Sequence, residues 1–264
     1  MRGQLSEGTV TDMSIEMPDF DTNIREAVRA FWGIRDMARQ RQLASGKADQ
    51  GERASVTAGK NMDGFLSIVR QLVVANGLPD AQVQVSRKLL TLPGYFRPTK
   101  VWDVVVIHEG RLVAALEFKS QVGPSFGNNF NNRAEEAIGT AHDFWVAFRE
   151  GAFGESPLPF VGWMMMLEDC EKSRQTVKDN CPNFSLFPEF KGASYCDRYN
   201  LLCKRLVKEQ LYTAAALLFS PRSGLESGEY SDLSEMTSIR TFFAGFAARV
   251  AIEAVRGAGE MLRW

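Results

Sequence analysis

The sequence predicts an α/β protein in which a mixed central β-sheet is flanked by helices. Three observations support this fold class: a β-hairpin signal, helical patterns on either side of it, and a fully apolar run that reads as a buried strand. In chain order, the elements on which the prediction rests occupy residues 61–75, 102–119, 132–149 and 160–167. Strands that carry apolar residues at nearly every position are covered on both faces.

The remaining elements follow from the same patterns. A first helix is expected over 21–44, and the apolar residues of 61–75 recur at the spacing of one helix face. Residues 83–89 alternate like a strand. After the first helix, the expected order is therefore helix, three strands, helix and strand.

The hairpin brings charged residues together. A turn centred near Glu109 and Gly110 places Asp103 roughly opposite Leu116, and hence beside Glu117. The two-residue period of a strand puts Lys119 on the same face as Glu117. Two carboxylates and an ammonium would then meet at one place, an arrangement that can hold magnesium and cut phosphodiesters.

Two interpretations of this triad stay open on spacing alone. Charges near a strand end are often solvated edge residues. The run from Leu112 to Leu116 has no polar residue, however, so the strand is expected to be buried. Charged residues at the end of a buried strand are costly unless they are paired or bind a metal, which favours a functional role. The same letters recur in Glu189-Phe190-Lys191, but that triplet lies between a proline and a glycine and is expected to be loop.

Longer stretches carry a resemblance to a known family. Residues 92–103, 116–129 and 192–195 resemble the XhoI family of type II restriction endonucleases, with similarity from about residue 19 to near residue 264. The resemblance implies a PD-(D/E)xK restriction-endonuclease-like core with helical additions at both ends. A tryptophan, Trp102, stands where the superfamily motif has proline before the catalytic aspartate.

The resemblance also implies the reaction. A type II restriction endonuclease of this family makes magnesium-dependent double-strand cuts in DNA at the palindrome CTCGAG and leaves 5′ overhangs. Asp103 and Glu117 would bind one or two magnesium ions with the main-chain carbonyl of Phe118, and Lys119 would orient or help deprotonate the attacking water. Asp63 is either a further metal ligand or an acid that complements the dipole of its helix.

The resemblance and the element order give a domain organisation. Residues 1–18 are expected to form a flexible N-terminal tail, and residues 19–264 a single endonuclease domain. The catalytic core is expected at about 60–167, with helical additions at 19–59 and 195–264.

Composition excludes several other classes. At 264 residues, with 45% apolar residues, the chain can bury a substantial core. The four cysteines lack zinc-ligand spacing, and reduced thiols in a prokaryotic cytoplasm are expected. No apolar run is long enough to span a membrane, and the start is unlike a secretory signal. The fragment Gly59-Lys60 lacks the rest of a phosphate-binding loop, so no nucleotide cofactor is expected.

The net charge of −1 does not favour a DNA partner by itself, so the distribution of cations matters. Arg25, Arg29 and Arg39 share a face of the first expected helix, where they either contact DNA or serve as a solvated surface. Lys47 and Arg53 lie in a polar link that is either a plain loop or a segment that orders on DNA.

Two segments near the triad are better placed to contact DNA. Arg97 and Lys100 precede Asp103 directly and would grip phosphates, unless the segment is a simple connector between strands. After Lys119 comes an amide-rich stretch that is expected to be a loop. Asparagine and arginine can pair with adenine and guanine in the major groove, but asparagine also favours turns and helix caps. The candidates in this stretch are Asn128, Asn129, Asn131, Asn132 and Arg133.

A palindromic target calls for a two-fold homodimer with one active site per strand. The candidate dimer surfaces are the apolar runs 211–219 and 239–255, although apolar stripes of this kind usually face the core. The resemblance also implies a cognate DNA methyltransferase in the same cell. Two rival functions remain: a PD-(D/E)xK nuclease of another specificity, for repair or recombination, and a DNA-binding protein without catalysis.

Overall fold

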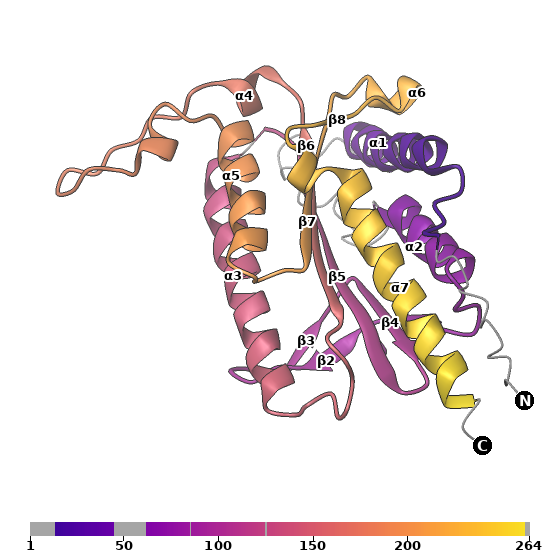
Figure 1. The fold of residues 1–264 in the computed structure, drawn as a ribbon. Helices are drawn as coiled ribbons and strands as arrows, with labels where there is room; N and C mark the ends of the chain where they lie inside the picture. Colours follow the sequence, from indigo (N-terminus) through magenta and orange to yellow (C-terminus); the bar gives the residue numbers. More distant parts are fainter. Residues whose placement is uncertain (1–13, 45–61, 85, 125, 262–264) are drawn as a thin grey trace, which may run out of the picture.

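A six-stranded mixed sheet runs through the centre of the protein, with helices on both faces (Figure 1). The structure is a computed structural model, and it describes residues 14–44, 62–84, 86–124 and 126–261. The helices are α1 Phe20–Ala44, α2 Asp63–Ala75, α3 Gly127–Arg149, α4 Glu171–Arg174, α5 Tyr195–Lys208, α6 Gly224–Ser227 and α7 Ile239–Met261. The strands are β1 Gln82–Gln84, β2 Thr91–Pro93, β3 Thr99–Val101, β4 Val104–His108, β5 Arg111–Gln121, β6 Phe160–Glu168, β7 Ala214–Ser220 and β8 Ser231–Asp232.

The sheet has the order β1-β4-β5-β6-β7-β8. Strands β5, β6 and β7 are parallel neighbours, and α3 and α5 provide the crossovers between them. The other three pairings are antiparallel. The predicted α/β class, with a mixed central sheet flanked by helices, is therefore confirmed, and the architecture is that of a restriction-endonuclease-like fold.

Two apolar layers separate the sheet from its helices. Phe31, Phe65 and Phe246 belong to the layer beneath α1, α2 and α7, whereas Phe144 and Tyr199 belong to the layer beneath α3 and α5. These aromatic side chains are 0–2% exposed and fix the helices against the sheet. Because α3 begins directly after β5, the end of β5 and the start of α3 lie together at one edge of the sheet.

The aromatic residues of both candidate dimer surfaces are buried. The run 211–219 is mostly β7, which is buried between β6 and β8. In the run 239–255, the aromatic residues Phe242, Phe243 and Phe246 are completely buried on α7. An interface needs accessible side chains, so the suggestion that these residues form one is wrong, and the alternative of a core role holds.

A β-bulge determines on which face of the sheet the side chains of the central strand β5 lie. Ile107 pairs with Leu112, but the next residue of β4, Val106, pairs with Ala114, so Val113 is an extra residue in β5. Leu112 packs in the α3 and α5 layer, whereas Val113 and Ala114 both pack in the opposite layer. Beyond Val113, odd-numbered side chains of β5 point toward α3.

The strand expected over 83–89 is much shorter in the structure. Strand β1 ends at Gln84, and the amides of Leu89 and Leu90 both donate hydrogen bonds to the carbonyl of Ser86, at 2.8 and 3.0 Å. That pattern is a helical turn and not a strand. The prediction for 86–89 is therefore wrong, because alternation alone does not distinguish a strand from a short turn-rich segment.

A two-stranded ribbon, β2 paired with β3, stands beside the main sheet and leads into β4. Its tip is fastened to α3 by one carboxylate: Asp143 accepts hydrogen bonds from the amides of Tyr95 and Phe96, both at 2.7 Å. The amide of Trp102 donates to the carbonyl of Leu90 at 2.9 Å and closes the base of the ribbon. The ribbon therefore has a fixed position next to the end of the hairpin.

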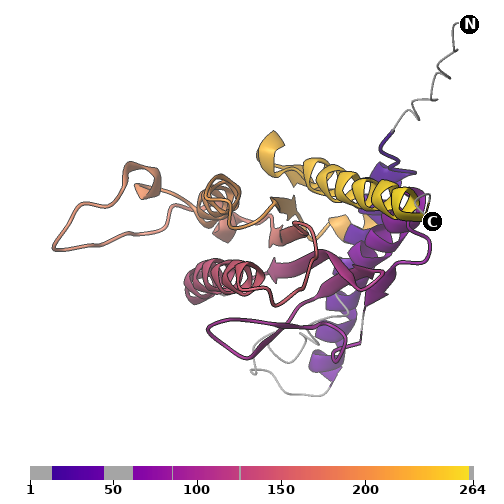
Figure 2. The same cartoon turned by 60° about the horizontal axis from the view of Figure 1, so that its bottom comes forward.

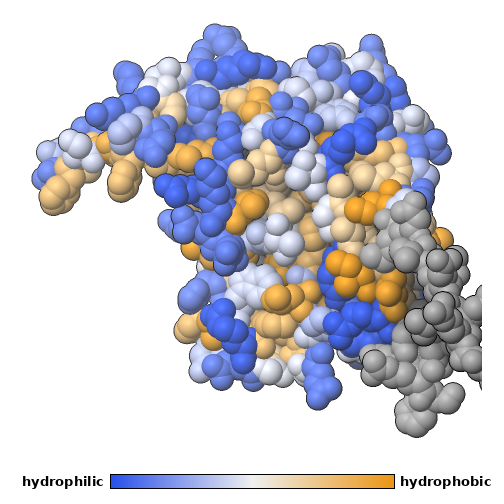
Figure 3. All heavy atoms as spheres, in the orientation of Figure 1, coloured by the Kyte–Doolittle hydropathy of each residue, from blue (hydrophilic) through white to orange (hydrophobic). Residues whose placement is uncertain are grey.

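A long arm leaves the body between α4 and α5 (Figures 1 and 2). A bridge between Thr176 and Ser194 and an ion pair between Asp179 and Arg198 hold its base. Phe184 and Phe187, in its outer part, are 81% and 75% exposed, and Figure 3 shows hydrophobic side chains among hydrophilic ones along the arm. The look-alike triplet 189–191 lies here, in a short 3-10 helix and the residue after it, outside any strand.

The segment before α1 is attached to the body of the protein. The amide of Glu16 donates to the side chain of Asn76 at 3.0 Å, so the chain is attached to the end of α2 just before α1 begins. In the part of the chain that the structure describes, no helix is both long enough and apolar enough to cross a membrane.

Candidate active site

Asp103 lies in a bend between β3 and β4, immediately before the strand on which it was expected. Its amide donates to the carbonyl of Leu116 at 3.1 Å, and its carboxylate accepts a 2.8 Å hydrogen bond from the amide of Phe118. Burial and the nearby carboxylate of Glu117 raise the pKa of Asp103 above its ordinary value, although Lys119 opposes the change. The predicted meeting of Asp103 with the end of β5 is present in the structure.

Glu117 is the most buried member of the group, with its side chain only 2% exposed. Lys100 contacts one of its carboxylate oxygens, and Lys119 contacts the other. A carboxylate this deep in the protein needs polar or charged partners. Two ammonium groups therefore hold the Glu117 carboxylate from both sides.

Lys119 joins three carboxylates. Besides Glu117, its ammonium lies 3.8 Å from Asp103 and 3.3 Å from Glu136 of α3. Burial by itself would lower the pKa of Lys119, but Glu117, Asp103 and Glu136 together outweigh burial and raise it. In this arrangement, Lys119 is a cation at neutral pH.

Glu136 is the acidic residue that the sequence analysis missed. It lies one helical turn after Arg133, which pairs with it at 2.8 Å. Burial alone would raise the pKa of Glu136, but Lys119 and Arg133 lower it below its ordinary value. The available signal was an acid on the helix that follows Lys119 and turns back along the same strand.

The amide-rich stretch forms the start of a helix and not the expected loop. Helix α3 begins at Gly127, so Asn129, Asn131 and Asn132 occupy its first two turns. Asn131 and Asn132 are exposed, whereas Arg133 is engaged with Glu136. The loop prediction fails because asparagine is common at helix starts as well as in turns. Asn128 belongs to the same turn, but its side chain lies outside the described residues, as do Lys47 and Arg53.

Arg97 and Lys100 are both engaged within the protein. The Arg97 guanidinium pairs with Asp143 at 2.7 Å and reaches Thr140 at 3.2 Å, which fastens the ribbon to α3. Lys100 turns inward to Glu117. Asp63 is exposed in the first turn of α2, and its metal role stays a prediction.

The arginines on the basic face of α1 differ in whether they are engaged within the protein. Arg29 donates to the carbonyls of Glu226 and Ser227, both at 3.1 Å, so it ties α1 to α6. Arg25 lies over the ring of Tyr230. Arg39 is exposed and lines a cavity of about 450 Å³ at the end of β5, together with Lys172 and Arg222.

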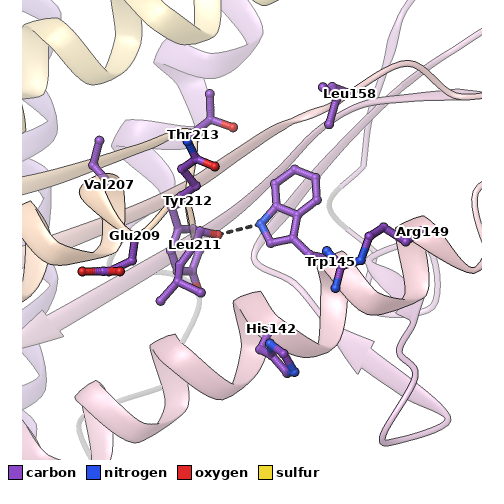
Figure 4. A pocket seen from close by; sticks show the side chains of 10 residues that line it. His142, Trp145, Arg149, Leu158, Val207, Glu209, Leu211, Tyr212 and Thr213 are labelled. Atoms are coloured by element: carbon purple, nitrogen blue, oxygen red, sulfur yellow. Dashed lines mark hydrogen bonds between the residues drawn. The ribbon is translucent and has the colours of Figure 1, made fainter.

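A second cavity, of about 520 Å³, lies away from the carboxylates (Figure 4). His142, Trp145 and Arg149 of α3 line it together with residues of the α5–β7 connection, and the Trp145 indole donates to the carbonyl of Leu211 at 2.8 Å. Neither Lys119 nor any of the three carboxylates around it lines this cavity. The chemistry therefore belongs to the carboxylate–lysine cluster.

The cluster presents hard oxygen donors, which is the ligand type that magnesium prefers. Asp103 and Glu117 converge on the single ammonium of Lys119. In the described residues, no group of three or more His, Cys, Asp or Glu side chains forms a metal site on its own. A magnesium ion held by these two carboxylates would therefore take its remaining ligands from main-chain oxygen, water or substrate, as magnesium commonly does.

The fold and site define an α/β enzyme with a restriction-endonuclease-like fold and a carboxylate–lysine cluster at one edge of its sheet. The chain belongs to the XhoI restriction endonuclease family, whose model, described as restriction endonuclease XhoI, matches residues 41–232. It is therefore a type II restriction enzyme, a site-specific deoxyribonuclease, and the expected family membership and enzyme class are confirmed.

Three relatives support this assignment. The chain is 62% identical over 172 residues to the type II restriction enzyme AbrI of Azospirillum brasilense, across 65% of this chain and 77% of the relative. It is 53% identical over 196 residues to the type II restriction enzyme XhoI of Xanthomonas vasicola, across 74% and 78%. It is 47% identical over 216 residues to the type II restriction enzyme BstVI of Geobacillus stearothermophilus, across 80% and 96%. No solved structure matches the chain.

Proposed function

We propose that this protein makes magnesium-dependent double-strand cuts in DNA at the palindrome CTCGAG and leaves 5′ overhangs. The observation that carries the proposal is the convergence of Asp103, Glu117 and Lys119 at the end of β5. The family supports the target, because the relative named XhoI shares 53% of its aligned residues with this chain.

The donor set fits a magnesium ion bound by Asp103, Glu117 and the main-chain carbonyl of Phe118. A bound magnesium ion would polarise the scissile phosphate and activate a water molecule. Asp103 is already oriented for such a role, because the amide of Phe118 fixes one of its oxygens. Glu117 is held in place from both sides by lysines.

Lys119 supplies positive charge where negative charge builds up during phosphodiester hydrolysis. Its ammonium lies between the proposed metal ligands, so it would orient or help deprotonate the attacking water and stabilise the phosphate. Glu136 acts through Lys119: it holds the ammonium from the α3 side at 3.3 Å and is itself positioned by Arg133. Lys119 is thus fixed between β5 and α3.

The proposal extends to partners and surroundings. A palindromic target requires a two-fold homodimer that places one site on each strand. The exposed amides of Asn131 and Asn132 at the start of α3 are the proposed base contacts, and the exposed Arg39 is a proposed phosphate contact. We further propose a cognate DNA methyltransferase that protects the host DNA, a cytoplasmic location, and a single endonuclease domain over 19–264.

Digestion of a plasmid with a single CTCGAG sequence, in magnesium and in EDTA, tests the proposal when the ends are sequenced. Linearisation at that sequence in magnesium alone, with 5′ overhangs, is the expected result. Cutting elsewhere would discard the assigned target and favour a nuclease for repair or recombination. Absence of cutting in magnesium and in manganese would favour a DNA-binding role without catalysis.

A further inference from the structure

Lys100 has an unusual position for a lysine at the edge of a small ribbon. Its neighbours on β3, Thr99 and Val101, are exposed, but its own side chain is only 14% exposed. The ammonium contacts one oxygen of Glu117, donates to the carbonyl of Val101 at 3.0 Å and lies 5.8 Å from the centre of the Trp102 ring. A lysine is seldom drawn inward like this unless an acid holds it.

Formal charges in the cluster balance without a metal. Three carboxylates, those of Asp103, Glu117 and Glu136, face three cations, which are Lys100, Lys119 and Arg133. A divalent ion that binds beside the largely buried side chains of Glu117, Lys100 and Lys119 adds two positive charges. Unpaired charge is costly in such surroundings, so a resident cation must leave or an anion must arrive.

Of the three cations, Lys100 is the one that can leave the cluster most readily. Lys119 touches three carboxylates from two sides, and Arg133 extends from the same helix as its partner Glu136. Among the described residues, Lys100 forms an ion pair with one acid, Glu117, and it has a flexible four-carbon stem on a strand whose flanks face solvent. The oxygen it contacts belongs to a proposed metal ligand.

We propose that Lys100 is the resident counter-cation of Glu117, and that it exchanges with the catalytic metal. When the metal binds Glu117, the ammonium of Lys100 is released from that carboxylate and binds a phosphate of the DNA backbone beside the cut. Metal binding thereby creates a DNA contact that the metal-free protein lacks. This inference rests on the proposed function, since it takes Glu117 to be a metal ligand and DNA to be the substrate.

If Lys100 exchanges with the metal, removal of its charge should strengthen magnesium binding, whereas a purely structural role for Lys100 predicts no such gain. Methionine at position 100 keeps the apolar stem and removes the competing charge, so Lys100→Met should bind magnesium about tenfold more tightly than the wild-type protein. Calorimetric titration of the full-length protein with magnesium chloride, without DNA, measures this. Lys100→Gln provides a second neutral variant, and Lys88→Met, at an exposed lysine of the turn before β2, is the matched control.

DNA binding supplies the second half of the test. In calcium, which supports binding to oxygen ligands, Lys100→Met should weaken binding of a CTCGAG duplex and lower the slope of log affinity against log salt by about one. In EDTA the variant should bind the duplex as the wild-type protein does. Equal weakening in calcium and in EDTA would overturn the exchange, and so would magnesium affinity that is unchanged or reduced in both neutral variants.

The two hypotheses fail in different ways. If the wild-type protein does not cut DNA but both neutral variants bind magnesium more tightly, the competition at Glu117 stands and the proposed cleavage does not. If the wild-type protein cuts at CTCGAG while magnesium affinity ignores position 100, the proposed function stands and the exchange is rejected.

Discussion

Asp103 and Phe118 are joined by a 2.8 Å hydrogen bond from the amide of Phe118 to the carboxylate of Asp103. Phe118 lies between Glu117 and Lys119 on β5. This bond therefore attaches Asp103, in the bend before β4, to the same short stretch of main chain that carries the other two members of the triad. The relative positions of the three groups are therefore set by main chain and not by flexible side chains alone.

Asp103→Asn should stabilise the metal-free protein at neutral and alkaline pH. Burial and Glu117 raise the pKa of Asp103, so the folded state disfavours its ionised form. The stability linked to this group is present below the pKa of the unfolded state, about 4, and is lost as pH rises through the folded-state pKa. Thermal unfolding in EDTA should show a higher Tm for the variant at pH 8 and a smaller difference at pH 4. A lower Tm at pH 8 would contradict the assignment.

Lys119→Ala should reduce cleavage by at least about 10²-fold while specific binding is retained, because it removes a cation that acts on the developing charge. Single-turnover cleavage in magnesium and gel-shift binding in calcium separate the two effects. The matched control is Lys191→Ala in the look-alike triplet of the arm, where the side chain is exposed. That variant should cut at the wild-type rate, and unchanged cutting by Lys119→Ala would remove Lys119 from the mechanism.

Glu136→Gln should lower kcat by about tenfold and leave KM close to the wild-type value. Glu136 holds the ammonium of Lys119 at 3.3 Å and does not touch the proposed metal ligands directly, so its loss affects the chemical step more than DNA binding. Steady-state kinetics on an oligonucleotide duplex measures both constants. Its exposed neighbour provides the control, because Glu135→Gln should have no effect; a rise in KM for Glu136→Gln would instead indicate a role in binding DNA.

Glu253→Gln should destabilise the fold by about 3 kcal/mol, because it removes the buried anion that two arginines bind. Glu253 of α7 is completely buried and binds Arg111 at 2.7 Å and Arg249 at 3.0 Å. Burial alone would raise its pKa, but these arginines lower it, so the stability it provides is lost as pH falls through the folded-state pKa. Urea unfolding at pH 7 measures the loss. Glu109→Gln, at a half-exposed partner of Arg111, should cost far less.

Cys181 should be the fastest of the four thiols to react with a thiol reagent. It is exposed in the arm, whereas burial raises the pKa of Cys196 to about 11 and that of Cys203 further. The thiolate is the reactive form, so both buried thiols should remain protected in the folded state. Timed reaction with a chromogenic disulfide, followed by mass spectrometry, measures the order. Cys181→Ser should remove the fast phase, and a fast phase that survives would contradict the exposed position of this residue.

The hairpin was predictable because local chemistry determines it. Glu109 and Gly110 both have positive φ, at 48° and 75°, as a tight two-residue turn requires, and the apolar strands around them are buried. The expected register was one residue off. Asp103 comes opposite Glu117 and not Leu116, because the bulge at Val113 advances β5 by one position. A bulge in a run of apolar residues leaves no trace in the sequence.

The rest of the site depends on contacts between distant segments. The pairing of Thr91 with Val101 forms a ribbon that turns Lys100 toward Glu117, and no local pattern distinguishes such a lysine from one in solvent. Glu136 reaches Lys119 only because α3 packs back along β5. Local patterns therefore predicted the hairpin, the helices on either side of it and the triad, whereas the ribbon, strand β7 and the counter-charges around the triad required the tertiary structure.

The bulge at Val113 also has a consequence for insertions and deletions. Surface hairpin turns usually tolerate a change of length, and the extra residue of the bulge gives β5 one position to spare. If one residue were lost between Ile107 and Ala114 and the pairing closed up without the bulge, Val106 would still pair with Ala114, so Glu117 and Lys119 would keep facing α3. If the pairing instead became regular with no residue lost, Val106 would pair with Val113, and Glu117 and Lys119 would point to the face beneath α7, away from Glu136. The extra residue therefore sets the face of the sheet on which the active site forms.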